Sequence, residues 1–298
     1  MGTLIVLLGP TGVGKTETCL RLADSFNIPV INADSRQIYR EIPIGTAAPT
    51  EEQRAKVHHY FVGTHNLEEY YSASLYEQEA LSVIKHEITE KGVALMSGGA
   101  MMYIDAVCKG IDDIPTVDNE TRLWMKERLE QEGLQALMEE LRILDPEHYA
   151  IVDRHNPRRV VHALEICHMT GQTYTSFRKG IQHLRPFNIL KIGLNRERDE
   201  LYQRINQRVL HMMKQGLLQE AQRLYPLRQL NALNTVGYKE IFTYLDGTIT
   251  LEEAVRQIQS NTRRYMRKQL TWFKKDENIR WFHPDNYEEI LNYINNSL

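Results

Sequence analysis

The sequence predicts an α/β protein, a parallel sheet flanked by helices and interrupted by an all-helical insertion. Three observations predict this fold. A glycine-rich segment follows an apolar run near the start of the chain and opens a segment of helical spacing. Short apolar runs then alternate with helix-like segments, as in parallel βαβ units. In the middle of the chain this alternation stops, and only helix-like segments follow.

Each element of the α/β part follows from its apolar pattern. Short apolar runs bounded by turn residues predict strands, and apolar residues at helical spacing predict helices. The predicted strands are residues 4–8, 29–32, 93–96 and 187–194. The predicted helices are residues 15–26, 74–91, 100–109, 197–215, 217–225, 237–245 and 251–275.

The sequence pattern changes after Pro115. Helix-like segments rich in Glu, Arg and Leu follow at residues 118–131, 134–143 and 157–170. We therefore expect two domains. The α/β core comprises residues 1–114 and 187–298, and the helical insertion comprises residues 115–186.

Composition places few limits on function. The chain has 298 residues and a formal net charge of −3, which by itself does not favour nucleic acid. No apolar run approaches the roughly 20 residues that span a bilayer, and residues 4–8 lead into the glycine-rich segment as a core strand rather than a signal peptide. Three widely spaced cysteines favour a reducing compartment. We expect a cytoplasmic protein without membrane contact.

The glycine-rich segment carries the strongest chemical signal. It matches the pattern G-x-x-x-x-G-K-[ST] between a strand and a helix, in the residues Gly9, Pro10, Thr11, Gly12, Val13, Gly14, Lys15 and Thr16. Such a loop turns backbone N–H groups toward an anion, with a lysine charge and a hydroxyl for Mg²⁺. We expect a P-loop NTPase-like core that binds a di- or triphosphate.

A carboxylate follows the second predicted strand. Asp34 lies where open α/β sheets bind ligands, and it could hold Mg²⁺ or accept a proton. A turn-capping role is equally compatible with its position. Gln37 could pair with an adenine edge and Arg36 could contact a phosphate, although an ordinary surface glutamine fits equally well.

Basic side chains gather in two stretches, at residues 154–191 and 263–280. Such stretches suit a polyanion, and the aromatic residues in the second also suit base stacking. Solvated helix faces and an aromatic helix packed on the core are the simpler explanations. No histidine or cysteine spacing indicates a zinc site.

Taken together, these segments resemble the tRNA dimethylallyltransferase (IPP transferase) family along nearly the whole chain. The blocks that carry the resemblance are residues 9–16, 34–40, 44–49, 58–59, 71–74, 156–165, 170–171, 204–208, 213–217, 236–239 and 267–272. The Asp34-Ser-Arg-Gln-Ile-Tyr block and the Lys268-Gln-Leu-Thr-Trp272 block are the most specific.

The resemblance implies transfer of a dimethylallyl group from its diphosphate to N6 of adenosine 37 in the tRNA anticodon stem-loop. The loop then holds a leaving diphosphate, with Mg²⁺ bound through Thr16. Asp34 is expected to be the general base, and Arg198 to face the diphosphate beside Lys15. The expected tRNA contacts are Asp34, Ser35, Arg36, Gln37, Ala100, Arg122, Arg158, Arg159, Val160, Val161, His162, Arg263, Arg267 and Lys268. We expect a monomer.

The chain departs from the family pattern at several positions. Ala100 stands where a threonine is usual, and His162 stands where an arginine is common. No Cys₂His₂ finger follows the last helix, so the resemblance is to bacterial members.

Three other functions stay open on the sequence. They are an ATP-dependent small-molecule kinase, a prenyltransferase acting on free AMP or ATP, and a non-catalytic RNA-binding protein. The long basic stretches favour a tRNA substrate over a free nucleotide.

Overall fold

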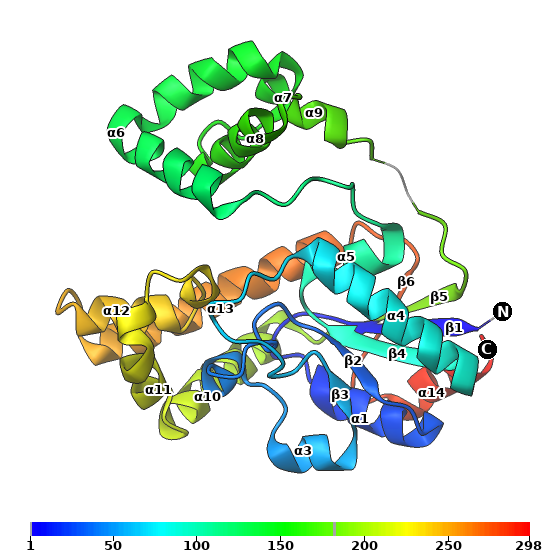
Figure 1. The fold of residues 1–298 in the computed structure, drawn as a ribbon. Coiled ribbons are helices and arrows are strands. Elements are labelled where there is room, and N and C mark those ends of the chain that lie inside the picture. The colour runs from blue at the N-terminus through cyan, green and yellow to red at the C-terminus, as the bar shows by residue number, and fades with distance from the viewer. Residues whose placement is uncertain (1, 181–182) are drawn as a thin grey trace. The chain divides into compact units, whose positions relative to one another are not determined.

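The computed structural model describes residues 2–180 and 183–298 (Figure 1). The chain divides into two compact units. The first, called here the α/β unit, comprises Met1–Lys109 and Leu184–Leu298. The second, the helical unit, comprises Gly110–His183.

The α/β unit is built on a six-stranded sheet in the order β3-β2-β4-β1-β5-β6, and all its neighbouring strands are parallel. The strands are β1 (Thr3–Leu8), β2 (Val30–Ala33), β3 (His59–Tyr60), β4 (Val93–Gly98), β5 (Asn188–Leu194) and β6 (Ile279–Phe282). The predicted fold class is therefore confirmed. Because β1 lies between β4 and β5, the glycine-rich loop that follows it opens at the middle of the sheet's carboxyl edge.

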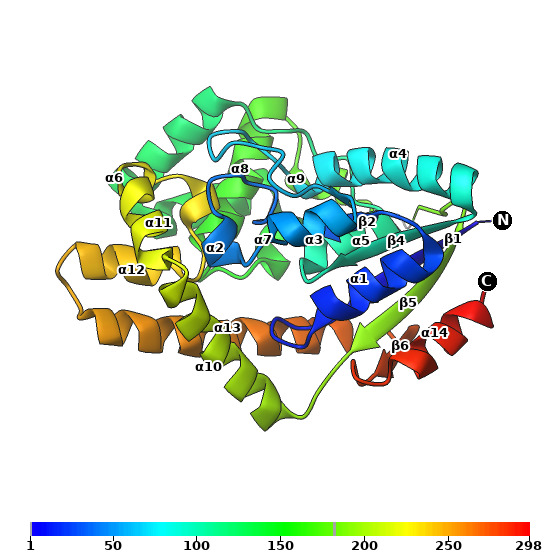
Figure 2. The same ribbon diagram turned by 90° about the horizontal axis from the view of Figure 1, so that it is seen from below.

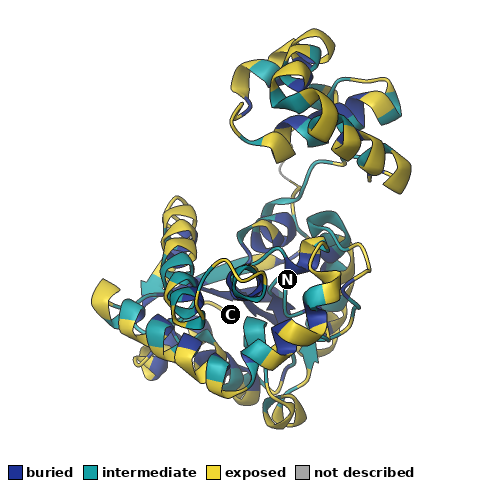
Figure 3. Ribbon diagram, turned by 90° about the vertical axis from the view of Figure 1, so that its left-hand side faces the viewer, coloured by how far each residue is buried: buried dark blue, intermediate teal, exposed yellow. Residues whose placement is uncertain are grey.

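The central strand has apolar side chains on both faces, which explains its unbroken apolar sequence. Leu4, Val6 and Leu8 pack into one core, whereas Ile5 and Leu7 pack into another. Figure 3 shows the strands buried beneath helices whose outer faces are exposed. The sheet is thus the middle layer of three.

Helices cover both faces of the sheet (Figure 1). The first core includes residues of α4 (Ala73–Lys91), α5 (Met101–Lys109), α11 (Leu217–Leu224), α12 (Tyr238–Leu245) and α13 (Leu251–Phe273). The second includes residues of α1 (Lys15–Phe26), α10 (Arg198–Lys214) and α14 (Tyr287–Asn295). Helices α10 and α13 cross and pack against each other (Figure 2). Two short helices, α2 (Pro43–Thr46) and α3 (Glu51–Lys56), lie between β2 and β3.

The helical unit has its own apolar core. Its helices are α6 (Asn119–Leu144), α7 (Pro146–Ile151), α8 (Pro157–Thr170) and α9 (Tyr174–Phe177). Leu137 and Leu141 of α6 pack with Val160 and Leu164 of α8. Helix α6 is kinked at Gly133, whose φ is 79°. The break expected between residues 131 and 134 lies at this glycine.

Some elements were not predicted. Strand β6 is only four residues long and its second residue is an arginine, so its apolar pattern is weak. Helix α14 follows it directly and pairs with α1 in the second core. Within the described ranges, no helix combines the length and apolar character needed to cross a membrane.

Candidate active site

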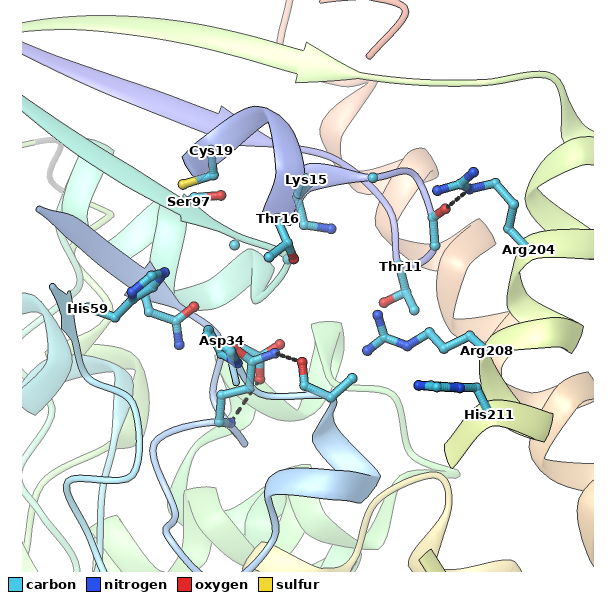
Figure 4. A pocket seen from close by; sticks show the side chains of 18 of the residues that line it. Thr11, Lys15, Thr16, Cys19, Asp34, His59, Ser97, Arg204, Arg208 and His211 are labelled. Atoms are coloured by element: carbon cyan, nitrogen blue, oxygen red, sulfur yellow. Dashed lines mark hydrogen bonds between the residues drawn. The ribbon is translucent and has the colours of Figure 1, made fainter. Parts of the chain in front are cut away.

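A cavity of about 710 Å³ opens at the carboxyl edge of the sheet (Figure 4). Its walls come from the glycine-rich loop, the ends of β2 and β4, and one face of α10. The lining residues are Thr11, Gly12, Gly14, Lys15, Thr16, Cys19, Val30, Asn32, Asp34, Gln37, Ala47, Pro49, His59, Ser97, Gly98, Gly99, Arg204, Gln207, Arg208, Leu210, His211 and Lys214. All of them belong to the α/β unit.

The glycine-rich loop has the backbone of an anion cradle. Gly12 and Gly14 have φ values of 86° and 109°, in the left-handed region that favours glycine. The Lys15 ammonium donates to the Gly9 and Pro10 carbonyls, at 2.9 Å each. Burial, and then the charge of Arg208, lower the pKa of Lys15 to about 8. The free Lys15 amine therefore loses its proton in mildly alkaline solution, whereas a bound anion would keep the amine protonated.

One buried side chain from α13 fixes the loop, and the sequence alone did not reveal it. Gln269 is 1% exposed and accepts from the Thr11 N–H at 2.9 Å. Its Nε2 donates to the Gly99 carbonyl, also at 2.9 Å. The glutamine thus joins the loop after β1 to the loop after β4. Gln269 lies in the Lys268–Trp272 block, one of the most specific blocks of the sequence, and this was the only sequence feature that pointed to it.

Asp34 caps a turn and also lines the cavity. Its Oδ1 accepts from the N–H groups of Arg36 and Gln37, at 2.9 and 3.2 Å, and so caps the turn. The same carboxylate lines the cavity. Figure 4 shows Asp34 facing the space in front of Lys15 and Thr16.

Of the residues expected beside Asp34, only Gln37 lines the cavity. Its Nε2 donates to the carbonyls of Thr46 and Ala47, at 3.1 and 3.2 Å. These bonds use the donors of the carboxamide and fix the side chain against α2. Ser35 and Arg36 do not line the cavity.

A basic row on α10 was missed by sequence reasoning. We call Arg204, Arg208, His211 and Lys214 the α10 row, since all four line the cavity. Figure 4 shows the first three on the side of the cavity opposite His59. Arg204 Nε donates to the Gly12 carbonyl at 2.8 Å. Spacings of four and three residues were visible in the sequence, but they do not reveal which helix face meets the loop.

Arg208 is the member of the row most closely tied to the other site residues. Its Nη2 donates to the Thr46 carbonyl at 3.3 Å. Burial lowers its pKa, and the Asp34 charge opposes that shift. Arg198, expected at the diphosphate, does not line the cavity: its Nε donates to the Tyr202 hydroxyl at 2.9 Å. Arg204 and Arg208 occupy the place where we expected Arg198.

The far wall of the cavity is formed by neutral groups. Burial raises the pKa of Cys19 to about 12, so its thiol stays protonated. Burial also lowers the pKa of His59, whose Nδ1 lies 2.7 Å from the Val57 carbonyl. Asn32 and Ser97 complete this wall. The cavity is therefore cationic at the loop and α10, whereas these four side chains add no charge to it and Asp34 faces the loop with a carboxylate.

The other expected RNA contacts of the α/β unit lie outside the cavity. Ala100 is buried, and its N–H donates to the Ala33 carbonyl at 3.0 Å. Arg263 donates to Asn206 at 2.6 Å and Arg267 donates to Tyr202 at 2.8 Å. Lys268 is exposed.

The remaining expected RNA contacts belong to the helical unit. Arg158 and Arg159 are exposed in the first turn of α8. Val160 is fully buried in the core of this unit, so its side chain has no free surface for RNA. Val161 and His162 are partly exposed, and His162 Nδ1 lies 3.2 Å from Glu165 Oε2. Arg122 is partly exposed on α6.

Two side chains of the cavity offer oxygen atoms to a metal ion. Thr16 supplies a hydroxyl and Asp34 a carboxylate, the hard ligands that suit Mg²⁺. Within residues 2–180 and 183–298, no cluster of three or more His, Cys, Asp or Glu side chains could hold an ion.

The class of protein follows from the fold and this cavity. A glycine-rich loop after the central strand β1 faces a carboxylate that follows β2 at the same edge of the parallel sheet. This arrangement defines an α/β phosphate-binding protein of the P-loop type. The family model described as IPP transferase matches residues 37–276. The chain therefore belongs to the IPP transferase family, and the resemblance noted in the sequence is confirmed.

Individual relatives match over nearly the whole of this chain. tRNA dimethylallyltransferase 1 of Phocaeicola vulgatus is 61% identical over 292 residues, covering 98% of this chain and 97% of the relative. tRNA isopentenylpyrophosphate transferase of Bacillus halodurans has a solved structure with a TM-score of 0.72 at 37% identity, covering 99% and 96% of the two chains. A eukaryotic dimethylallyltransferase acting on tRNA gives a TM-score of 0.77 at 26% identity, covering 91% of this chain and 70% of that one.

Proposed function

We propose that this chain transfers a dimethylallyl group from dimethylallyl diphosphate to N6 of adenosine 37 in tRNA anticodon loops, releasing diphosphate. One observation carries the proposal: the glycine-rich loop with Lys15, the arginines of α10 and the Asp34 carboxylate line the same cavity. The relatives named above carry out tRNA prenylation by name. The similarity to these relatives favours a reaction in which a carbon atom is attacked over a reaction in which a phosphoryl group is transferred.

The leaving group is stabilised by the loop. As the allylic C1–O bond breaks, its electrons stay on the diphosphate, whose charge grows. Lys15 exchanges its contacts with Gly9 and Pro10 for this anion, and Arg208 adds a second charge. Mg²⁺ bound through the Thr16 hydroxyl would neutralise part of the same charge.

The acceptor side is assigned to Asp34. N6 of adenosine attacks C1 and forms the new N–C bond, and the nitrogen then loses a proton to the carboxylate. Because Oδ1 is engaged in the turn, Oδ2 is the oxygen that takes this proton. Gln37 presents its carboxamide oxygen from the same turn, toward the exocyclic amino group or ring edge of the base. The adenine leaves its stack to enter the cavity.

The basic surfaces are assigned to tRNA. Four residues of the α10 row span about 15 Å of helix at 1.5 Å per residue, which is longer than one diphosphate. We assign Arg204 and Arg208 to the diphosphate, and His211 and Lys214 to a backbone phosphate of the RNA. Arg158 and Arg159 provide phosphate contacts from the helical unit, which we take as the insertion domain expected at residues 115–186.

The cellular setting follows from the substrate. We place the enzyme in the cytoplasm, where tRNA is found, and its three buried free cysteines suit that reducing compartment. We also propose that the enzyme is a monomer.

The test is incubation with dimethylallyl diphosphate, Mg²⁺ and unmodified tRNA, followed by mass analysis of the nucleosides. Isopentenyladenosine at position 37 is the expected product. Its absence, with consumption of ATP in the absence of RNA, would instead indicate a kinase. Product formed from free AMP or ATP would indicate a free-nucleotide prenyltransferase, and tRNA binding without any product would indicate a non-catalytic protein.

A further inference from the structure

Glu220 of α11 is a buried carboxylate that the chemistry above does not use. It is 1% exposed. Its Oε2 accepts from the Ile44 N–H at 3.0 Å, and its Oε1 accepts from the Gly45 N–H at 2.8 Å and the Tyr238 hydroxyl at 2.5 Å. A buried carboxylate is costly unless it is fully hydrogen-bonded. All its described partners lie on α2 or on Tyr238.

Helix α2 is also held by cavity residues. The Thr46 carbonyl accepts from Gln37 Nε2 at 3.1 Å and from Arg208 Nη2 at 3.3 Å. The Ala47 carbonyl accepts from Gln37 Nε2 at 3.2 Å. Glu220 therefore binds the N–H groups of this short helix, while two cavity side chains bind carbonyls at its other end.

The packing around α2 leaves little freedom. A Cβ atom added at Gly45 would lie 2.4 Å from the Tyr238 hydroxyl oxygen, so only glycine permits this approach. Burial raises the pKa of Tyr238 well above its usual value, and the Glu220 charge raises it further. The tyrosine is thus a permanent hydrogen-bond donor to the carboxylate. A displacement of Glu220 would move α2 as a unit.

We propose that Glu220 is a positioning residue for the transfer reaction. It fixes α2 through the N–H groups of Ile44 and Gly45, and α2 fixes the side chains of Gln37 and Arg208 through the Thr46 carbonyl. The contribution to transfer rests on the proposed function, whereas the mechanical link rests only on the hydrogen bonds.

Glu220→Gln tests the link with little change in shape. A carboxamide has one acceptor oxygen, so its NH₂ group meets a backbone N–H that it cannot accept from. Glu240→Gln is the matched control. Glu240 is 4% exposed and accepts from the Gly237 N–H at 2.8 Å and from Asn261 at 2.7 Å. Neither of these hydrogen bonds involves α2 or a residue that lines the cavity.

A double-mutant cycle with Gln37→Ala separates positioning from general stability. We expect Glu220→Gln to lower kcat/KM for tRNA about tenfold. In the Gln37→Ala background we expect it to lower kcat/KM much less, because one of its targets is already gone. Glu240→Gln should have the same factor in both backgrounds. Effects of Glu220→Gln and Gln37→Ala that simply multiply would overturn the proposal.

The Gln37 side-chain amide provides a readout that does not need turnover. Its NMR signals, assigned by their loss in Gln37→Ala, should shift in Glu220→Gln and stay in place in Glu240→Gln. If Glu220→Gln does not fold, Gly45→Ala replaces it in this experiment. The added methyl group pushes α2 away from Tyr238 and leaves the carboxylate intact, so the Gln37 signals should shift in this variant too. Unmoved signals would refute the link. A wild-type chain without prenyl transfer would refute only the proposed function.

Discussion

Replacing Asp34 by asparagine removes the proposed proton acceptor and keeps the turn. Oδ1 accepts from the N–H groups of Arg36 and Gln37 at 2.9 and 3.2 Å, and an asparagine oxygen can accept both. Loss of a general base costs about 10²–10⁴-fold in rate. We expect Asp34→Asn to lower the single-turnover rate by that factor, with tRNA affinity little changed.

Asp34→Ala extends the same test. It also removes the two hydrogen bonds of the turn, each worth about 1 kcal/mol, and so loosens Gln37. We expect it to be up to about thirtyfold slower than Asp34→Asn, since the two bonds together are worth about 2 kcal/mol and about 1.4 kcal/mol corresponds to tenfold. The assay is transfer from excess enzyme to unmodified tRNA, quenched in time and read by nucleoside mass spectrometry. A rate for Asp34→Asn within tenfold of the wild type would refute the assignment of the base.

Three further predictions concern other parts of the site. Because the pKa of Lys15 is lowered to about 8 in the free protein and bound diphosphate favours the charged amine, affinity for inorganic diphosphate should fall as pH rises through about 8. Calorimetry should show this extra slope in the wild type and not in Lys15→Arg, and equal slopes would contradict it. Replacing Arg158 and Arg159 by alanine should weaken tRNA binding and reduce the slope of log K against log salt by about 0.7–0.9 for each lost phosphate contact. An unchanged slope would place these side chains away from the RNA. Ala100→Thr should raise stability by about 1 kcal/mol by capping α5, because the Ala100 carbonyl already accepts from the N–H groups of Tyr103 and Ile104. A thermal melt checks this, and transfer kinetics show whether the added hydroxyl also speeds the reaction.

The elements best predicted from sequence are those with local signals at their ends. Helix α8 runs from Pro157 to Thr170, as expected, because proline suits the first helical position and Gly171 takes a left-handed conformation after the last. The glycine-rich loop was predicted equally well, since its glycines, lysine and threonine form one contiguous sequence motif.

The parts that sequence reasoning missed depend on tertiary packing. The α10 row is a repeat of basic residues on a helix, and it becomes part of the cavity only because Leu201 and Ile205 anchor α10 in the second core. The sequence pattern places Glu220 on the polar face of an amphipathic helix. In the structure it is buried by α2 and Tyr238. Arg198 begins the same helix as the α10 row, but its side chain turns to Tyr202.

The contact made by Gln269 has a consequence for biosynthesis. The phosphate-loop sequence is complete at residue 16, but its Thr11 N–H is held by a side chain 258 positions later. A nascent chain that has emerged only as far as the insertion thus carries the motif without this hydrogen bond. Since domains fold as they are synthesised, the substrate cavity is completed near the end of translation. Incomplete chains therefore lack the hydrogen bond that joins the loop to α13.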